Sequence, residues 1–182
     1  MSFIFEKLAL PEVILVKPRI FGDSRGYFME TYKKSEFTAM GIAAEFVQDN
    51  QSVSAKNIFR GLHYQLAPKA QGKLVRALSG AILDFAVDVR AASPTFGKWV
   101  SARLDSENKH MLWIPEGFAH GFLSLEDGTV VAYKATAEYS KEHERGISWN
   151  DPNIALRIPT ARPILSEKDA ALPQLEEAVK VP

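Results

Sequence analysis

The chain has 182 residues, of which 46% are hydrophobic and 24% are charged. This length predicts a single domain over residues 1–182, large enough to bury a core without a metal or disulfide. The 22 basic and 22 acidic residues cancel, which argues against nucleic acid or an anionic membrane as the main partner. The absence of cysteine excludes disulfides, thiolate zinc sites and cysteine nucleophiles. No stretch is typical of a secretory signal or a membrane span, so we expect a cytoplasmic protein.

Short strand-like segments dominate the chain. Val13–Val16 comes first, and a two-turn helix over Lys33–Met40 is expected to end at Gly41. The later strand candidates are Lys73–Leu78, Ala81–Arg90, Lys98–Leu104, Met111–Ile114, Gly121–Leu125, Thr129–Thr136 and Gly146–Trp149. Short strands at this spacing predict an all-β fold, an antiparallel barrel or sandwich with its core at about residues 40–150 and short helices at its edges.

The clearest local pattern lies in Ala81–Arg90, where every second residue from Leu83 to Val89 is apolar. This alternation predicts a strand with one buried and one polar face. Ser79-Gly80 separates it from Lys73–Leu78, so the two segments are predicted to form a hairpin.

A second helical region is expected at the C-terminal end, over about residues 164–180. Ser166 is suited to cap a helix that starts with the acidic residues Glu167 and Asp169. The segment Ala170–Val179 would continue it, although Pro173 must break or restart any helix there.

The string Arg60–Gln65 contains His63, the first candidate for chemistry. On a regular strand, Arg60, Leu62 and Tyr64 would share one face, while His63 and Gln65 would lie on the other with Gly61. Gly61 is also a candidate for a bulge or bend that changes this register. A partly buried histidine bonded to backbone is the alternative interpretation of His63.

A second string, Trp113–Phe122, contains Pro-x-Gly-x-x-His ending at His120, which is similar to the second motif of cupins, small jelly-roll barrels. Metal-binding cupins use two upstream histidines and a glutamate, but here Gln65 and Lys73 stand at the matching positions. A charged lysine is a poor metal ligand, so the sequence predicts no metal site. The remaining histidines, His110 and His143, lie in polar segments typical of the surface.

A cation with two imidazoles suits an anionic intermediate better than a metal. Removing a proton beside a ketone needs a base and a group that stabilises the enolate oxygen. His63 is a candidate base, and Lys73 or His120 could offset the charge on oxygen. Inversion also needs a proton donor on the opposite face, for which Tyr133 is a candidate. Ordinary barrel core is the alternative for Tyr133.

A cationic and aromatic set suggests a phosphate-bearing ligand. Arg25 and Arg60 could clamp phosphate oxygens, Tyr139 could stack on a planar base, and Glu30 or Gln48 could bind its edge. Solvated surface ion pairs are the alternative interpretation of both arginines.

Taken together, these strings resemble the dTDP-4-dehydrorhamnose 3,5-epimerases of the L-rhamnose pathway, from about Val13 to the segment Ser166–Asp169. The matching segments are Phe21–Gly26, Phe46–Asn50, Arg60–Gln65, Gln71–Arg76, Ser93–Gly97, Trp113–Phe122, Tyr133–Thr136, Trp149–Pro152 and Ser166–Asp169. The resemblance implies a cofactor-independent, cupin-like jelly-roll (double-stranded β-helix) domain that forms a homodimer by strand exchange. It implies inversion of C3 and C5 in dTDP-4-dehydro-6-deoxy-D-glucose.

The resemblance also implies roles for individual residues. His63 matches the general base, Tyr133 the acid that returns a proton, and Asp169 the carboxylate that orients the histidine. Lys73 matches the residue near the keto oxygen, and Tyr139 the aromatic that stacks on thymine. The other residues implied to contact the nucleotide sugar are Arg25, Glu30, Gln48, Asp49, Asn50, Arg60, His120, Glu144 and Lys168.

One position departs from the family pattern: Gln51 stands where histidine is usual, which we expect to bear on substrate preference rather than on reaction class. Three alternatives remain. An epimerase that inverts only one carbon would share these motifs. A non-catalytic nucleotide-sugar-binding cupin would not need both His63 and Tyr133. A metal-dependent cupin is disfavoured by Gln65 and Lys73.

Overall fold

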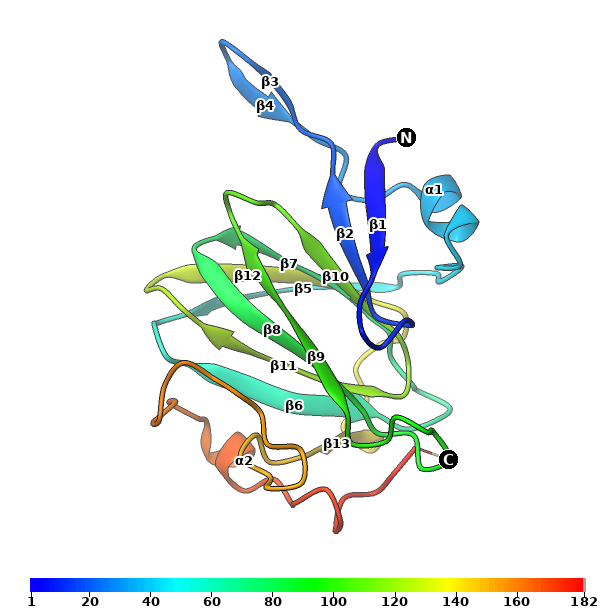
Figure 1. The fold of residues 1–182 in the computed structure, drawn as a ribbon, viewed down its shortest axis with the longest axis vertical. Helices are drawn as coiled ribbons and strands as arrows, with labels where there is room; N and C mark the ends of the chain where they lie inside the picture. The colour runs from blue at the N-terminus through cyan, green and yellow to red at the C-terminus, as the bar shows by residue number, and fades with distance from the viewer. Residues whose placement is uncertain (182) are drawn as a thin grey trace.

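The computed structural model describes residues 1–181 and is built almost entirely of antiparallel strands (Figure 1). A six-stranded sheet has the order β1-β2-β10-β7-β12-β5, and a five-stranded sheet the order β13-β6-β11-β8-β9. The first comprises β1 (Phe3–Lys7), β2 (Ile14–Pro18), β10 (Met111–Ile114), β7 (Lys73–Ser79), β12 (Thr129–Ala135) and β5 (Gln48–Ser54). The second comprises β13 (Glu144–Gly146), β6 (Phe59–Gln65), β11 (Phe118–Ser124), β8 (Ala81–Asp88) and β9 (Trp99–Asp105). The expected all-β, cupin-like barrel is confirmed.

The remaining elements lie outside the two sheets. They are the hairpin of β3 (Phe21–Asp23) and β4 (Gly26–Phe28), helix α1 (Lys34–Ala39) and helix α2 (Glu167–Ala170). In Figure 1 the β3–β4 hairpin extends away from the barrel, and α2 lies beside β6 with the C-terminal segment. Among residues 1–181, the helices are too short and too polar to cross a membrane.

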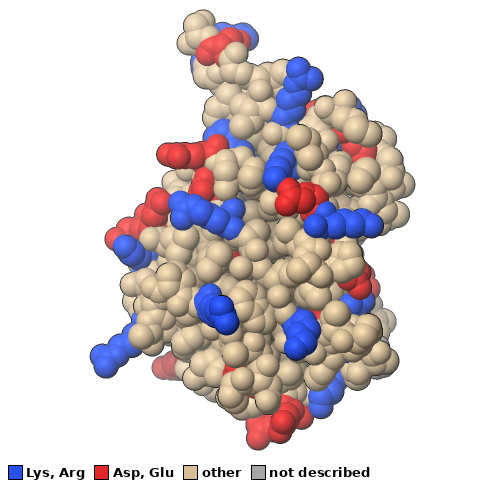
Figure 2. Space-filling view, in the orientation of Figure 1, with Lys and Arg blue, Asp and Glu red and all other residues tan. Residues whose placement is uncertain are grey.

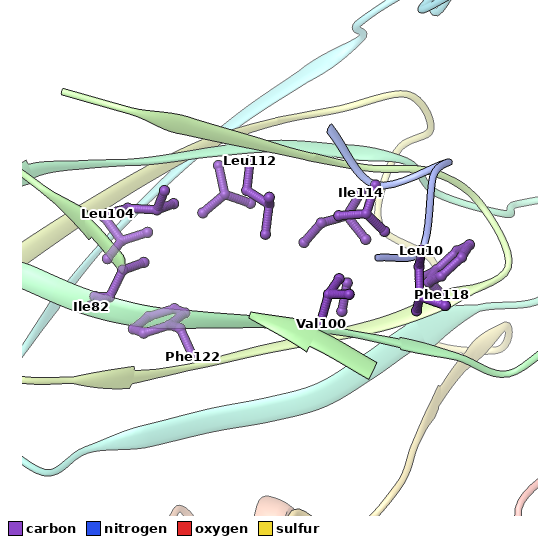
Figure 3. Close-up of a cluster of buried hydrophobic side chains, with 12 residues drawn as sticks. Leu10, Ile82, Val100, Leu104, Leu112, Ile114, Phe118 and Phe122 are labelled. Atoms are coloured by element: carbon purple, nitrogen blue, oxygen red, sulfur yellow. The ribbon is translucent and has the colours of Figure 1, made fainter. Parts of the chain in front are cut away.

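The core fills the space between the sheets. Side chains from the six-stranded sheet, such as Leu112 and Ile114, point toward Ile82, Leu104 and Phe122 of the five-stranded sheet (Figure 3). A second cluster packs the outer face of the five-stranded sheet against the C-terminal segment, and a third packs α1 and β1 on the outer face of the six-stranded sheet. The barrel wall is therefore covered on both faces over much of its area.

The predicted hairpin of Lys73–Leu78 and Ala81–Arg90 is wrong. Both strands form, but β7 pairs with β10 and β12, whereas β8 pairs with β9 and β11 in the other sheet. Gly80, with φ +68°, takes the chain from one sheet to the other, and a Cβ there would meet the Thr129 hydroxyl at 2.4 Å. A Ser-Gly turn fits a tight connection of either kind, so the local signal could not decide which strands pair.

The predicted C-terminal helical segment over about 164–180 is also largely wrong. The helix is a single turn, α2, capped by Ser166 as expected, and it ends before Pro173. Beyond it the chain forms only a short turn, in which the N–H groups of Glu177 and Ala178 donate to the carbonyl of Gln174. Leu175 and Ala178 pack against the outer face of the barrel, so tertiary contacts rather than helical bonds hold this segment.

Candidate active site

A pocket of about 260 Å³ opens between the two sheets. Strands β5, β7 and β12 contribute from one sheet, β6 and β11 from the other, and α2 closes one side. Its lining comprises Ser52, Arg60, His63, Lys73, His120, Phe122, Tyr133, Ser166, Lys168 and Asp169. The five titratable residues named for proton transfer and for orienting the histidine thus lie in one cavity: His63, Lys73, His120, Tyr133 and Asp169.

A bulge in β6 places Arg60 and His63 on the same wall of this pocket. His63 pairs with His120, and Arg60 with Phe122, so three steps along β6 match two along β11. Gly61, with φ +119°, lies at the bulge, where a Cβ would lie 2.6 Å from the Cα of Gly121. The bulge indicated by Gly61 is confirmed, and the regular alternation that separated Arg60 from His63 is wrong.

His63 and Asp169 form a dyad. His63 Nε2 lies 2.7 Å from Asp169 Oδ1, and the Asp169 backbone N–H donates to the Ser166 hydroxyl at 3.1 Å. Burial raises the pKa of Asp169, but hydrogen bonds from His63 and Ser166 outweigh it and leave this pKa lowered. An ionised Asp169 only accepts, so His63 carries its proton on Nε2 and presents Nδ1 as the basic nitrogen.

A second dyad lies deeper in the barrel. His120 Nε2 is 2.7 Å from Asp84 Oδ1, and the Asp84 side chain is completely buried. Burial lowers the pKa of His120, against the opposing effect of Asp84. The alternating pattern of Ala81–Arg90 predicted a polar, half-exposed face for Asp84, so its place in the site was not predicted. In fact β8 is buried on both faces, and a carboxylate inside such a strand is the signal that could have marked it.

Lys73 is buried in the same region, with Nζ 3.4 Å from the carbonyl oxygen of His63. Burial lowers the pKa of Lys73 to about 8, although Asp84 and Glu144 act to raise it. Lys73 is therefore a cation at neutral pH that loses its proton in mildly alkaline solution.

Tyr133 faces the pocket from β12, in the sheet opposite to His63, with its ring centroid 6.5 Å from that of His120. Burial, helped by Glu144 and opposed by Arg60, raises the pKa of Tyr133. The phenol therefore keeps its proton at neutral pH and can donate it.

A chain of hydrogen bonds links five further predicted residues. Gln48 donates to Asn50 at 2.8 Å and accepts from the backbone N–H of Tyr139 at 2.8 Å. The Tyr139 hydroxyl donates to Glu144 at 2.8 Å, and Lys168 reaches Glu144 at 2.6 Å. Because Lys168 lines the pocket and Tyr139 is exposed, this series of hydrogen bonds extends from the pocket to the surface.

Three of the residues predicted to contact the nucleotide sugar lie away from the pocket of their own polypeptide chain. Arg25 sits in the exposed β3–β4 hairpin and pairs with Asp23 at 2.6 Å, while Glu30 lies between that hairpin and α1. Asp49 is on the outer face of β5, paired with Lys134 at 2.9 Å. Asp49 faces outward because side chains alternate along a strand. Gln48, Asn50 and Ser52 lie on the inner face of β5, so Asp49 between them lies on the outer face.

Gln51 shares the outer face of β5 with Asp49 and pairs in register with Ala132. It does not line the pocket that contains His63, but a separate cavity of about 430 Å³ that Asp49 and Lys134 also line. The expected bearing of Gln51 on substrate preference therefore has no direct contact to support it.

The histidines outside the pocket, His110 and His143, are partly buried rather than fully on the surface. Within residues 1–181, no three His, Asp or Glu side chains are arranged to hold a metal ion.

Comparison with known proteins agrees with these features. The family model "dTDP-4-dehydrorhamnose 3,5-epimerase" matches residues 7–177. The chain is 54% identical to the dTDP-4-dehydrorhamnose 3,5-epimerase of Shigella flexneri, covering 90% of this chain and 91% of the relative. The crystal structure of dTDP-4-dehydrorhamnose 3,5-epimerase from Sulfolobus tokodaii matches with a TM-score of 0.94 and 49% identity, covering 100% of both chains.

A second structure, of dTDP-6-deoxy-D-glucose-3,5-epimerase from Legionella pneumophila in complex with dTDP-4-keto-L-rhamnose, has a TM-score of 0.93 and 44% identity. It covers 96% of this chain and 94% of that one. The match extends over the strands that carry the pocket as well as the segment that carries Asp169. The chain belongs to the dTDP-4-dehydrorhamnose 3,5-epimerase family.

Proposed function

We propose that residues 1–182 act as one epimerase domain that converts dTDP-4-dehydro-6-deoxy-D-glucose into dTDP-4-dehydro-L-rhamnose. The observation that carries this function is the placement of His63 and Tyr133 on opposite walls of one pocket. Inversion at a carbon requires that a proton leave from one face of the sugar and return to the other. A base and an acid on facing sheets meet this requirement.

His63 removes the proton in this mechanism. Its Nε2 is occupied by Asp169, so Nδ1 takes the proton from the carbon beside the 4-keto group. The imidazolium that forms is stabilised by the Asp169 carboxylate at 2.7 Å. The same base acts at C5 and at C3, because both carbons adjoin the carbonyl.

Lys73 stabilises the enolate oxygen. It is the buried cation of the pocket, and a cation in a site of low dielectric lowers the energy of a developing oxyanion strongly. Tyr133 then donates its phenolic proton to the carbon from the other side. Exchange with solvent returns a proton to the tyrosinate and removes the proton that His63 took up, so both groups are ready for the second carbon.

Nucleotide binding is assigned to the pocket rim. Arg60 and Lys168 supply positive charge for the diphosphate, and the exposed ring of Tyr139 offers a surface on which thymine can stack. Gln48, Asn50 and Glu144 supply hydrogen-bonding groups beside it. The diphosphate charge keeps such a substrate from crossing membranes, which is the basis for proposing a cytoplasmic location.

A homodimer with exchanged strands is part of the proposal, because it gives Arg25 and Glu30 a role. The β3–β4 hairpin leaves Phe28 66% and Tyr27 59% exposed, and Figure 1 shows it extending from the barrel. Apolar side chains at such positions are typical of a surface that a partner covers. In an exchanged dimer, Arg25 would reach the pocket of the second copy.

Incubation with dTDP-4-dehydro-6-deoxy-D-glucose in deuterated water tests this function. Deuterium is expected at both C3 and C5, detected by NMR of the sugar. Label at one carbon only would establish an epimerase of single specificity instead. Binding of dTDP without label at either carbon would identify a nucleotide-sugar-binding module and refute the enzyme.

A further inference from the structure

The pocket contains two His–Asp dyads, of which the reaction described above uses only one. His63 and His120 are directly paired across β6 and β11, and each ring has its Nε2 2.7 Å from a carboxylate. The two carboxylates differ in origin. Asp169 comes from α2 at the edge of the barrel, whereas Asp84 comes from the middle of the barrel wall.

The buried position of Asp84 is energetically unfavourable for a carboxylate. Its side chain has no solvent exposure, and its Oδ2 has no hydrogen-bond partner among the described residues. A buried carboxylate with an unpaired oxygen costs several kcal/mol of desolvation unless nearby charge compensates it. Asp88 on the same strand is equally buried, but its carboxylate is bound by Arg90, Ser93 and Thr95. A buried aspartate on β8 can therefore have partners for both oxygens, which makes the unpartnered Oδ2 of Asp84 a specific feature.

The buried cation that lines the same pocket as His120 is Lys73. Burial is the main influence on its pKa, and among acidic groups Asp84 is the strongest in raising it, followed by Glu144. The titratable and charged groups around this region are Arg60 and His63 on β6, His120 on β11, Tyr133 on β12, Glu144 on β13, and Lys168 and Asp169 on α2. The acids near the pocket are all paired: Glu144 with Lys168 at 2.6 Å, Asp169 with His63, and Asp84 with His120 through Oδ1. Among these three acids in the described residues, Asp84 alone keeps a buried oxygen, Oδ2, without a hydrogen-bond partner.

We propose that Asp84 is a positioning residue that holds His120 through Nε2, so that Nδ1 is presented to the sugar, and that its unpartnered Oδ2 supplies negative charge that balances the buried Lys73 of the same pocket. An ionised carboxylate can only accept, so His120 is fixed as the neutral Nε2–H tautomer and its Nδ1 accepts a hydrogen bond from a substrate hydroxyl. His120 thereby stays uncharged while its neighbour His63 takes up the substrate proton. The contact of His120 with the sugar rests on the proposed function, whereas the tautomer of His120 and the charge balance with Lys73 do not.

The first test uses the wild-type protein without substrate. Long-range ¹H–¹⁵N NMR is expected to show His120 neutral, with its proton on Nε2, between pH 6 and 8. A proton on Nδ1, or a charged ring in this range, would overturn the assignment whether or not the protein is an epimerase.

The second test removes the charge and keeps the shape. In Asp84→Asn, the Lys73 pKa measured by NMR of its Cε protons is expected to fall by roughly one pH unit, because an opposite charge has been lost. The signal is assigned by its absence in Lys73→Met. Asp88→Asn is the matched control, with the same substitution on the same buried strand, and is expected to leave the Lys73 titration at its wild-type value.

An unchanged Lys73 titration in Asp84→Asn, or an equal fall in Asp88→Asn, would overturn the charge role. In the epimerase assay, the alkaline limb of kcat should move to lower pH in Asp84→Asn by the same amount as the Lys73 titration. If wild-type protein gives no epimerisation, the proposed function fails while the two NMR measurements still decide the role of Asp84.

Discussion

Two histidines in one pocket acquire different chemistry from their surroundings. The His63 side chain is 27% exposed, so it can exchange protons with substrate and solvent, whereas His120 is buried beside Asp84. The motifs marked both histidines in the sequence, and resemblance implied Asp169. The role of Asp84 was not predicted, because its strand alternates apolar and polar residues, a pattern typical of a strand with one solvated face. In the structure the polar positions of β8 face the barrel interior instead.

Replacing His63 with alanine removes the proposed base and leaves the rim contacts in place. The rate of deuterium exchange into the substrate should fall by roughly 10²- to 10⁴-fold, the usual contribution of a positioned general base. Affinity for dTDP, measured by calorimetry, should change by less than about twofold. An exchange rate close to that of wild type would show that another group is the base.

Replacing Tyr133 with phenylalanine keeps the ring and removes the acidic proton. Because His63 is untouched, deuterium should still enter the substrate on the original face, but inversion should fall by roughly 10²-fold or more. NMR separates the retained and inverted products. Inversion at the wild-type rate would assign the proton donor elsewhere.

At the scale of elements, strand-forming segments were predictable and their partners were not. The segment Met111–Ile114 matches β10 residue for residue, and Thr129–Thr136 matches β12 to within one residue. The pairing of β7 and β8 was missed because sheet membership depends on contacts between residues far apart in sequence. The bulge at Gly61 could be suspected from the glycine alone, but its effect, which brings Arg60 and His63 to one wall, depends on the register with β11.

The close approach of β6 and β11 gives a direct test of that bulge. In Gly121→Ala, the added Cβ would lie 2.7 Å from the carbonyl oxygen of Arg60, so one strand must move. We expect a loss of unfolding free energy on the order of 2 kcal/mol and a lower kcat, since His63 shifts with β6.

Gly22→Ala is the matched control, because its Cβ would lie at an ordinary 3.7 Å from the nearest atom. Its unfolding free energy, from denaturant titration, should stay within about 0.5 kcal/mol of wild type. A Gly121→Ala variant of full stability and activity would contradict the tight packing at the bulge.

At the scale of the whole molecule, the site joins groups from both sheets and from the C-terminal segment. Neither the meeting of Tyr133 with His63 nor the separation of Arg25 from both follows from local sequence signals. The charges also fit a small ligand better than a polyanion: on the face shown in Figure 2, Lys and Arg lie among Asp and Glu rather than forming one basic surface. Positive charge is instead placed at the pocket, through Arg60, Lys73 and Lys168.

Strand exchange makes a prediction for mixed dimers. Arg25→Ala and His63→Ala should each be strongly impaired as pure proteins. After co-expression, a mixed dimer contains one pocket with an intact His63 and an intact Arg25 from the partner, so activity should recover to roughly a quarter of wild type. No recovery, or a monomer by light scattering, would contradict the exchanged dimer.

The most direct measurement is a crystal structure of the protein with a dTDP-linked 4-keto sugar or its dTDP-hexose analogue. We predict that His63 Nδ1 and the Tyr133 hydroxyl oxygen lie on opposite faces of the hexose, each within about 4 Å of C3 or C5, with Lys73 beside O4. Both groups on the same face of the ring, or a hexose bound outside the pocket between the sheets, would contradict the mechanism.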